Sequence, residues 1–177
     1  MTAHKLIIAG FGGQGILMMG QLIAYAAMSE GREVTWMPSY GPEMRGGTAN
    51  CSVIVSDKKI SSPIILEAST VAAMNQPSLT KFEPILAPGG KLFINISLIK
   101  NLPTRNDLEI VSVDANGIAA GLGTDKVSNI VMLGAIVDQT EIVKTESVVA
   151  AMEKLMKGDK ENLLPLNRKA LTAWKNR

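Results

Sequence analysis

Residues 5–18 read KLIIAGFGGQGILM, and this stretch decides the fold. Its first five residues, Lys5 to Ala9, form an aliphatic run of strand length, and a cluster of glycines follows at once. Residues 16–28 are apolar nearly all round and rich in alanine, which favours a buried helix. Gly31 is placed to cap that helix, and Glu33–Met37 has the composition of a second strand. The stretch therefore predicts a βαβ unit.

Beyond this unit the chain continues to alternate between strand and helix patterns. Residues 48–55 place apolar side chains at every second position, which is the period of a strand. Residues 57–59 are expected to turn into a short return strand near Ile60, which would make the sheet mixed. Further strands are expected at residues 69–75, 91–97 and 110–114, and helices at 77–86, 127–137, 146–156 and about 161–175. The prediction is one α/β domain over residues 1–177, with a three-layer α/β/α architecture, a central mixed, mostly parallel sheet and a Rossmann-like start.

The composition limits the class of protein. Of the 177 residues, 46% are hydrophobic and 19% are charged, which suits one domain with a buried core. The net charge of +2 is too small to indicate a nucleic-acid partner. Cys51 is the only cysteine, so this chain alone can hold neither a disulfide nor an iron–sulfur cluster, and a cytoplasmic location is expected. Residues 6–29 are uncharged, but their glycines favour a tight turn, so neither a membrane span nor a signal peptide is expected.

The glycine turn is the first candidate site. Gly10-Phe-Gly-Gly-Gln-Gly15 has the GxGxxG spacing of a dinucleotide-binding turn between a strand and a helix. Its backbone N–H groups and the helix start would suit an anion. A nicotinamide enzyme also needs an acidic residue at the end of the second strand, where this chain has Met37, Pro38 and Ser39, so an isolated dehydrogenase is not favoured. The candidate residues are Gly10, Gly12, Gly13, Gln14 and Gly15.

The alternative is that these glycines only allow the strand and the helix to pack closely. In either case a β-branched residue at Gly12 is expected to harm folding, because such residues tolerate a positive φ badly.

A loop rich in proline and glycine is the second candidate site. Residues 38–47 are expected to be irregular, because their prolines and glycines oppose regular structure. Such a stiff loop would hold Glu43 and Arg45 ready for a contact with another chain or an anionic ligand. The alternative is a tight surface turn with two solvated charges. The candidate residues are Tyr40, Gly41, Pro42, Glu43, Arg45, Gly46 and Gly47.

Together the two motifs resemble a known family. The turn at residues 10–15, followed by Ser39-Tyr-Gly-Pro-Glu-Met-Arg-Gly-Gly-Thr48, is similar to the gamma subunit, or the equivalent internal domain, of pyruvate and other 2-oxoacid:ferredoxin oxidoreductases. The likeness extends through residues 52–56, 75–77, 88–90 and 129–134. Within the family, the stretches at residues 39–44 and 48–51 look more like the four-subunit 2-oxoglutarate or branched-chain enzymes.

The resemblance implies a division of labour between subunits. Such enzymes decarboxylate a 2-oxoacid on thiamine diphosphate and magnesium, pass electrons through iron–sulfur clusters to ferredoxin, and transfer the acyl group to coenzyme A. Alpha and beta catalytic subunits and a ferredoxin-like delta subunit would carry these cofactors, in agreement with the absence of a Gly-Asp-Gly motif here. This chain would then hold no cofactor or metal and no catalytic residue, and would fix its position against alpha and beta through residues 40–47.

Two questions stay open at this point. The glycine turn could contact other subunits or the phosphates of coenzyme A. The chain could instead be a stand-alone nucleotide-binding regulatory module that uses this turn for a phosphate. His4, the only histidine, is expected to be a surface residue because no other metal-ligand type lies near it in the sequence.

Overall fold

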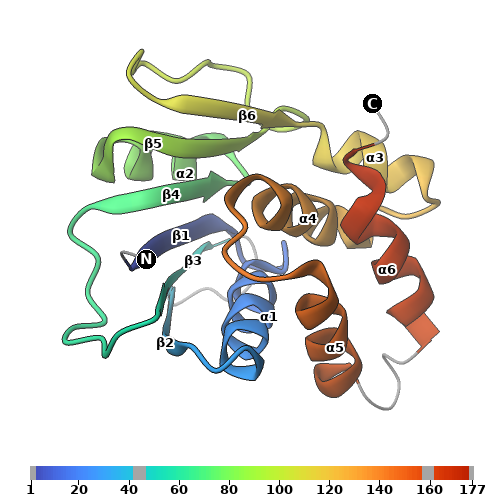
Figure 1. Ribbon diagram of the computed structural model, residues 1–177. Helices are drawn as coiled ribbons and strands as arrows, with labels where there is room; N and C mark the ends of the chain where they lie inside the picture. The colour runs from blue at the N-terminus through green and yellow to red at the C-terminus, as the bar shows by residue number, and fades with distance from the viewer. Residues whose placement is uncertain (1–2, 42–46, 157–161, 176–177) are drawn as a thin grey trace.

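The computed structural model describes residues 3–41, 47–156 and 162–175. Its centre is a six-stranded sheet in the order β2-β3-β1-β4-β5-β6 (Figure 1). β1 pairs in parallel with β4, β4 with β5 and β5 with β6, whereas β3 is antiparallel to both β1 and β2. The predicted mixed, mostly parallel sheet is confirmed. The strands are β1 His4–Phe11, β2 Glu33–Tyr40, β3 Thr48–Ser56, β4 Ala68–Ala73, β5 Leu86–Asn95 and β6 Glu109–Val113.

Helices cover the two faces of the sheet unequally. α1 and α4 lie against one face, with α5 and α6 packed onto them (Figure 1). The side chains of Leu6 and Ile8 belong to the core on this face, which is the larger of the two. Ile7 and Ala9, one position out of phase, face a smaller core that α2 closes. The α/β architecture is therefore as predicted. The helices are α1 Ile16–Ser29, α2 Gln76–Phe82, α3 Ala115–Gly121, α4 Ser128–Thr140, α5 Thr145–Leu155 and α6 Leu164–Ala173, with short 3-10 turns η1 Glu83–Ile85 and η2 Asp125–Val127.

The structure corrects several details of the sequence prediction. The expected return strand near Ile60 is wrong, because residues 57–67 contain neither helix nor strand. The sheet is mixed because β3 itself is antiparallel to its neighbours. β5 begins at Leu86 and runs through the Pro88–Gly90 segment, where its pairing with β4 is irregular. The short helix α3 was not predicted, and the Asp114 side chain caps it by accepting a hydrogen bond from the N–H of Gly117 at 3.3 Å.

β2 also extends further than predicted. The strand continues through Pro38 to Tyr40, which pairs with Ala49 of β3, so the irregular loop does not begin at residue 38. β2 lies at the edge of the sheet. An edge strand tolerates proline because the N–H groups on its outer side have no strand to bond.

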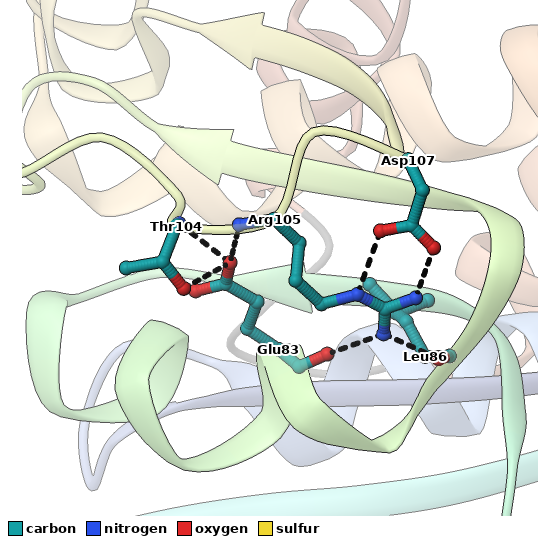
Figure 2. A network of polar contacts seen from close by, with 5 residues as sticks. All are labelled: Glu83, Leu86, Thr104, Arg105 and Asp107. Atoms are coloured by element: carbon teal, nitrogen blue, oxygen red, sulfur yellow. Dashed lines mark hydrogen bonds and ion pairs between the residues drawn. The ribbon is translucent and has the colours of Figure 1, made fainter.

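The connection from β5 to β6 contains no helix, and a polar network holds it in place (Figure 2). The buried Glu83 carboxylate accepts hydrogen bonds from the N–H and hydroxyl of Thr104, at 2.6 and 3.0 Å, and from the N–H of Arg105, at 2.7 Å. The Arg105 guanidinium donates to the carbonyl of Leu86 at 2.6 Å and to the carboxylate of Asp107. The network fastens this crossover to η1 and to the start of β5.

His4 is not the surface residue that the sequence suggested. It is partly buried at the start of β1, and its Nε2 lies 3.0 Å from the hydroxyl of Thr70. Burial first, and then the nearby cations Arg32 and Lys91, together lower the pKa of His4 from its ordinary value of 6.5 to about 4.

This pKa predicts a pH dependence of stability. Because folded His4 binds a proton less readily than unfolded His4, its contribution is complete above about pH 6.5 and is lost as the pH falls through 4. We expect a loss on the order of 2 kcal/mol over this window. His4→Gln, which keeps a hydrogen-bonding group but cannot titrate, should flatten the dependence. Urea unfolding at pH 7.5, 6 and 5 measures the free energy of unfolding of both proteins. If this free energy falls equally with pH in the original protein and in His4→Gln, the prediction is wrong.

Candidate functional site at the carboxyl edge of the sheet

The predicted glycine turn joins β1 to α1, as the spacing indicated. The N–H of Gln14 donates to the carbonyl of Phe11 at 3.1 Å, and the Gln14 side chain accepts from the N–H of Phe11 at 2.6 Å. The turn needs positive φ at Gly13 (97°) and at Gly15 (72°), which directly precedes α1. Gly12 is not among the described residues with positive φ, so the reason given for its sensitivity was wrong.

Two glycines of the turn also permit close packing. A Cβ atom on Gly10 would lie 2.6 Å from the Gln14 Oε1 and from Ile16 Cδ1. A Cβ on Gly15 would lie 2.3 Å from the Nδ2 of Asn129, which comes from α4. The close-packing alternative therefore accounts for Gly10 and, together with its φ, for Gly15.

The second motif lies directly against the first. The N–H of Gly12 donates to the carbonyl of Gly47 at 2.8 Å, and the N–H of Gly41 donates to the carbonyl of Thr48 at 3.0 Å. The turn after β1 and the two ends of the loop after β2 thus form one structural unit. The candidates Pro42, Glu43, Arg45 and Gly46 lie outside the described residues.

A cleft of about 470 Å³ opens beside this unit. Phe11 and Tyr40 are its exposed aromatic residues, with 36% and 61% of their surface accessible, and both lie at the ends of their strands. No cationic side chain occurs among the described residues that line the cleft, so a bound phosphate would find there only backbone N–H groups and the hydroxyls of Tyr40 and Thr48. Its lining residues are Phe11, Gly12, Gly13, Gly15, Ile16, Leu17, Met18, Tyr40, Thr48 and Ala49.

The described residues at the cleft include neither a reactive thiol nor a cluster of metal ligands. Cys51 is fully buried behind it, and burial raises the pKa of its thiol to about 12, so the thiol stays protonated at neutral pH. The described residues contain no group of three His, Cys, Asp or Glu side chains that could hold a metal ion. Within the same residues, no helix combines the length and apolarity needed to cross a bilayer.

Asparagine side chains that the sequence analysis did not assign support the turn. Asn75 follows β4, donates to the Gln14 Oε1 at 3.4 Å, and caps α2 by accepting from the N–H of Ser78 at 2.9 Å. Asn129 donates to the carbonyl of Gly15 at 3.5 Å. The cap formed by Asn75 could have been predicted from the sequence, because asparagine two residues before a proline is typical of a helix start. The hydrogen bond of Asn129 could not, because it joins residues 114 positions apart.

Comparison with known proteins places the chain in a family. A family model described as "Pyruvate ferredoxin/flavodoxin oxidoreductase" matches residues 5–174. The chain belongs to this family. This confirms the resemblance drawn from the two motifs.

Relatives of the chain within this family are subunits of enzymes that are named for different 2-oxoacids. The chain is 37% identical, over 96% of its length, to the ketoisovalerate oxidoreductase subunit VorA of Methanothermobacter thermautotrophicus, of which it spans only 35%. It is 32% identical to the 2-oxoglutarate synthase subunit KorC of Methanocaldococcus jannaschii, covering 93% of this chain and 90% of KorC. The chain thus corresponds to nearly all of KorC and to about a third of VorA.

Solved structures of the pyruvate ferredoxin/flavodoxin oxidoreductase family share the fold. The gamma subunit of a keto/oxoacid ferredoxin oxidoreductase from Geobacter sulfurreducens superposes with a TM-score of 0.83 at 30% identity, covering 97% of this chain and 96% of that one. A 2-oxoglutarate:ferredoxin oxidoreductase from Magnetococcus marinus gives a TM-score of 0.91 at 20% identity, covering 99% of this chain and 31% of that one. This domain therefore occurs both as a separate subunit and within a longer chain.

Proposed function

We propose that this chain is the gamma subunit of a multi-subunit, thiamine-diphosphate-dependent 2-oxoacid:ferredoxin oxidoreductase. The enzyme would decarboxylate a 2-oxoacid oxidatively to an acyl-CoA and reduce ferredoxin. The proposal rests on the match to KorC and to the Geobacter gamma subunit. Each match covers nearly the full length of this chain and of the other protein. The substrate we favour is 2-oxoglutarate or a branched-chain 2-oxoacid, in line with the names of the KorC and VorA relatives.

The cofactors of the complex would lie on other chains. One cysteine cannot hold an iron–sulfur cluster, and the described residues offer no metal-binding group, so the side chains present do not fit these cofactors. Alpha and beta subunits would carry thiamine diphosphate and magnesium, and beta or a ferredoxin-like delta subunit would carry the clusters. The complex would work in the cytoplasm.

The contribution of this chain would be to assembly. The described residues that line the cleft are uncharged and mostly apolar, with Phe11 and Tyr40 exposed, and such a surface matches the buried centre of a protein interface better than a phosphate site. The glycine turn would therefore contact other subunits rather than the phosphates of coenzyme A. The same lack of cationic lining disfavours the stand-alone nucleotide-binding module.

Purification of the complex tests the proposal. The tagged chain, isolated without oxygen from its native host, is expected to bring down larger cofactor-bearing chains that reduce a viologen dye with one 2-oxoacid and coenzyme A. A chain that stays alone and binds a nucleotide tightly in calorimetry would establish the regulatory module instead.

Single substitutions test the role in assembly. Tyr40→Ala and Arg45→Ala should each raise the apparent Kd for the other subunits about tenfold or more, because tyrosine and arginine are enriched among the residues that dominate interface energies. The Tm of the isolated chain should stay within about 2 °C, since surface substitutions cost little stability. Lys59→Ala, an exposed cation just beyond the end of β3, is the matched control. Unchanged affinity in both variants would rule out the cleft and loop as the contact.

A further inference from the structure

A second hollow, of about 180 Å³, adjoins the cleft beneath the start of α4. Met18 of α1 lines both spaces. The second hollow is further lined by Asn129 and Ile130 of α4, by Asn167 of α6, and by residues of η2 and of the end of α5. Met18 is the one described lining residue that it shares with the cleft proposed for subunit contact.

Two asparagines on its wall are almost fully buried yet poorly bonded. Asn129 and Asn167 expose only 5% and 3% of their surface. Within the described part of the chain, the side chain of Asn129 makes one hydrogen bond, at 3.5 Å to the carbonyl of Gly15, and that of Asn167 makes one, from Nδ2 to the sulfur of Met156 at 3.3 Å. Among the described residues, neither Oδ1 atom has a hydrogen-bond partner. Because a carboxamide has two donors and two acceptor lone pairs, both groups retain unused capacity beside the hollow.

The other lining residues indicate which kind of ligand the hollow could bind. Met18, Ile130, Met156 and Leu166 supply apolar walls, which suit aliphatic carbon. Lys126 supplies an exposed cation at the same hollow, just before the first turn of α4, a 13-residue helix. The positive end of that helix adds to the attraction for an anion.

From this arrangement we propose that the hollow binds a short aliphatic amide that carries an anionic end. The amide N–H and C=O would exchange hydrogen bonds with the carboxamides of Asn129 and Asn167, which donate and accept equally well. The aliphatic part would lie on the methionine and leucine walls, and the anionic group would lie near Lys126. A free metabolite or a segment of a protein chain could present such a group, and the chemistry recognised is the same.

Titration of the full-length, ¹⁵N-labelled chain tests the site with three probes of matched length. N-acetyl-β-alanine has the amide and the carboxylate, its methyl ester lacks the charge, and hexanoate replaces the amide by methylene groups. N-acetyl-β-alanine is expected to bind saturably, with shifts confined to the residues around the hollow, and about tenfold more tightly than hexanoate. A tetrapeptide that ends in β-alanine tells whether the site also accepts the group on a longer chain.

Variants assign the contacts. Asn167→Leu, which keeps the number and branching of the side-chain heavy atoms but removes the amide, should weaken binding of N-acetyl-β-alanine about tenfold and should not weaken binding of hexanoate. Lys126→Gln should weaken the acid severalfold but not the ester, and this comparison still tests the site if Asn167→Leu does not fold. Lys169→Gln, an exposed cation elsewhere on α6, is the control. Equal binding of hexanoate and the amide would overturn the proposal and leave a site that recognises only an aliphatic anion. The absence of a saturable shift for every probe would overturn it as well and leave a hollow filled by water.

Discussion

Replacing Gly134 with valine is expected to lower the free energy of unfolding by about 3 kcal/mol or more. Gly134 lies within α4, where α6 packs against it. A Cβ atom added there would lie 1.9 Å from the carbonyl oxygen of Leu171 and 2.8 Å from its carbonyl carbon. These are backbone atoms, which no rotamer change can move. α6 would have to shift bodily, and the buried side chains of Ala170 and Leu171 would lose their packing.

Gly134→Ala tests the close approach of Leu171 against the gain in helix propensity. In an open helix position glycine to alanine stabilises by about 1 kcal/mol. Gly121, the last residue of α3, has nothing within 4 Å of an added Cβ and is the control for that gain. Gly134→Ala should instead destabilise, because the close approach to Leu171 outweighs helix propensity. Urea unfolding followed by circular dichroism measures both variants, and a Gly134→Ala protein as stable as Gly121→Ala would refute the argument.

The sequence predicted those features that depend on neighbouring residues. The aliphatic run, the glycine turn and the alanine-rich helix at residues 5–28 follow from local pattern, and β1 and α1 lie there. The resemblance to the oxidoreductase family rested on two motifs, and these motifs lie against each other through the bond from Gly12 to Gly47. Local rules were sufficient because a resemblance is recognised from residue order alone and needs no knowledge of tertiary contacts.

The features missed depend on tertiary position. Pro38 argues against a strand unless the strand is at an edge, and the edge position of β2 follows from the order of the whole sheet. His4 looked isolated in sequence, but Thr70 of β4 lies beside it and burial shifts its pKa. Likewise, nothing near Gly134 in the sequence shows that α6 approaches it. Contacts between distant segments decide these positions.

Gly15→Ala is the second substitution with a large expected effect, and Gly13→Ala is its matched partner. Both glycines have positive φ, but only at Gly15 would an added Cβ meet other atoms, namely the Asn129 side chain at 2.3 Å from Nδ2 and 2.8 Å from Cγ. Gly13→Ala should therefore cost only the conformational strain, about 1 kcal/mol. Gly15→Ala should cost about 2 to 3 kcal/mol, because the buried Asn129 must also be displaced.

A double-mutant cycle separates the two contributions. Asn129→Ala removes the atoms closest to the added methyl group. When Asn129 is already alanine, Gly15→Ala should therefore cost little more unfolding free energy than Gly13→Ala does. The coupling is expected to be about 1 kcal/mol or more, measured by urea unfolding. Additive effects would mean that Gly15 is required only for its backbone conformation. Coupling would instead show that the Asn129 side chain at the start of α4 limits the space beside the turn after β1.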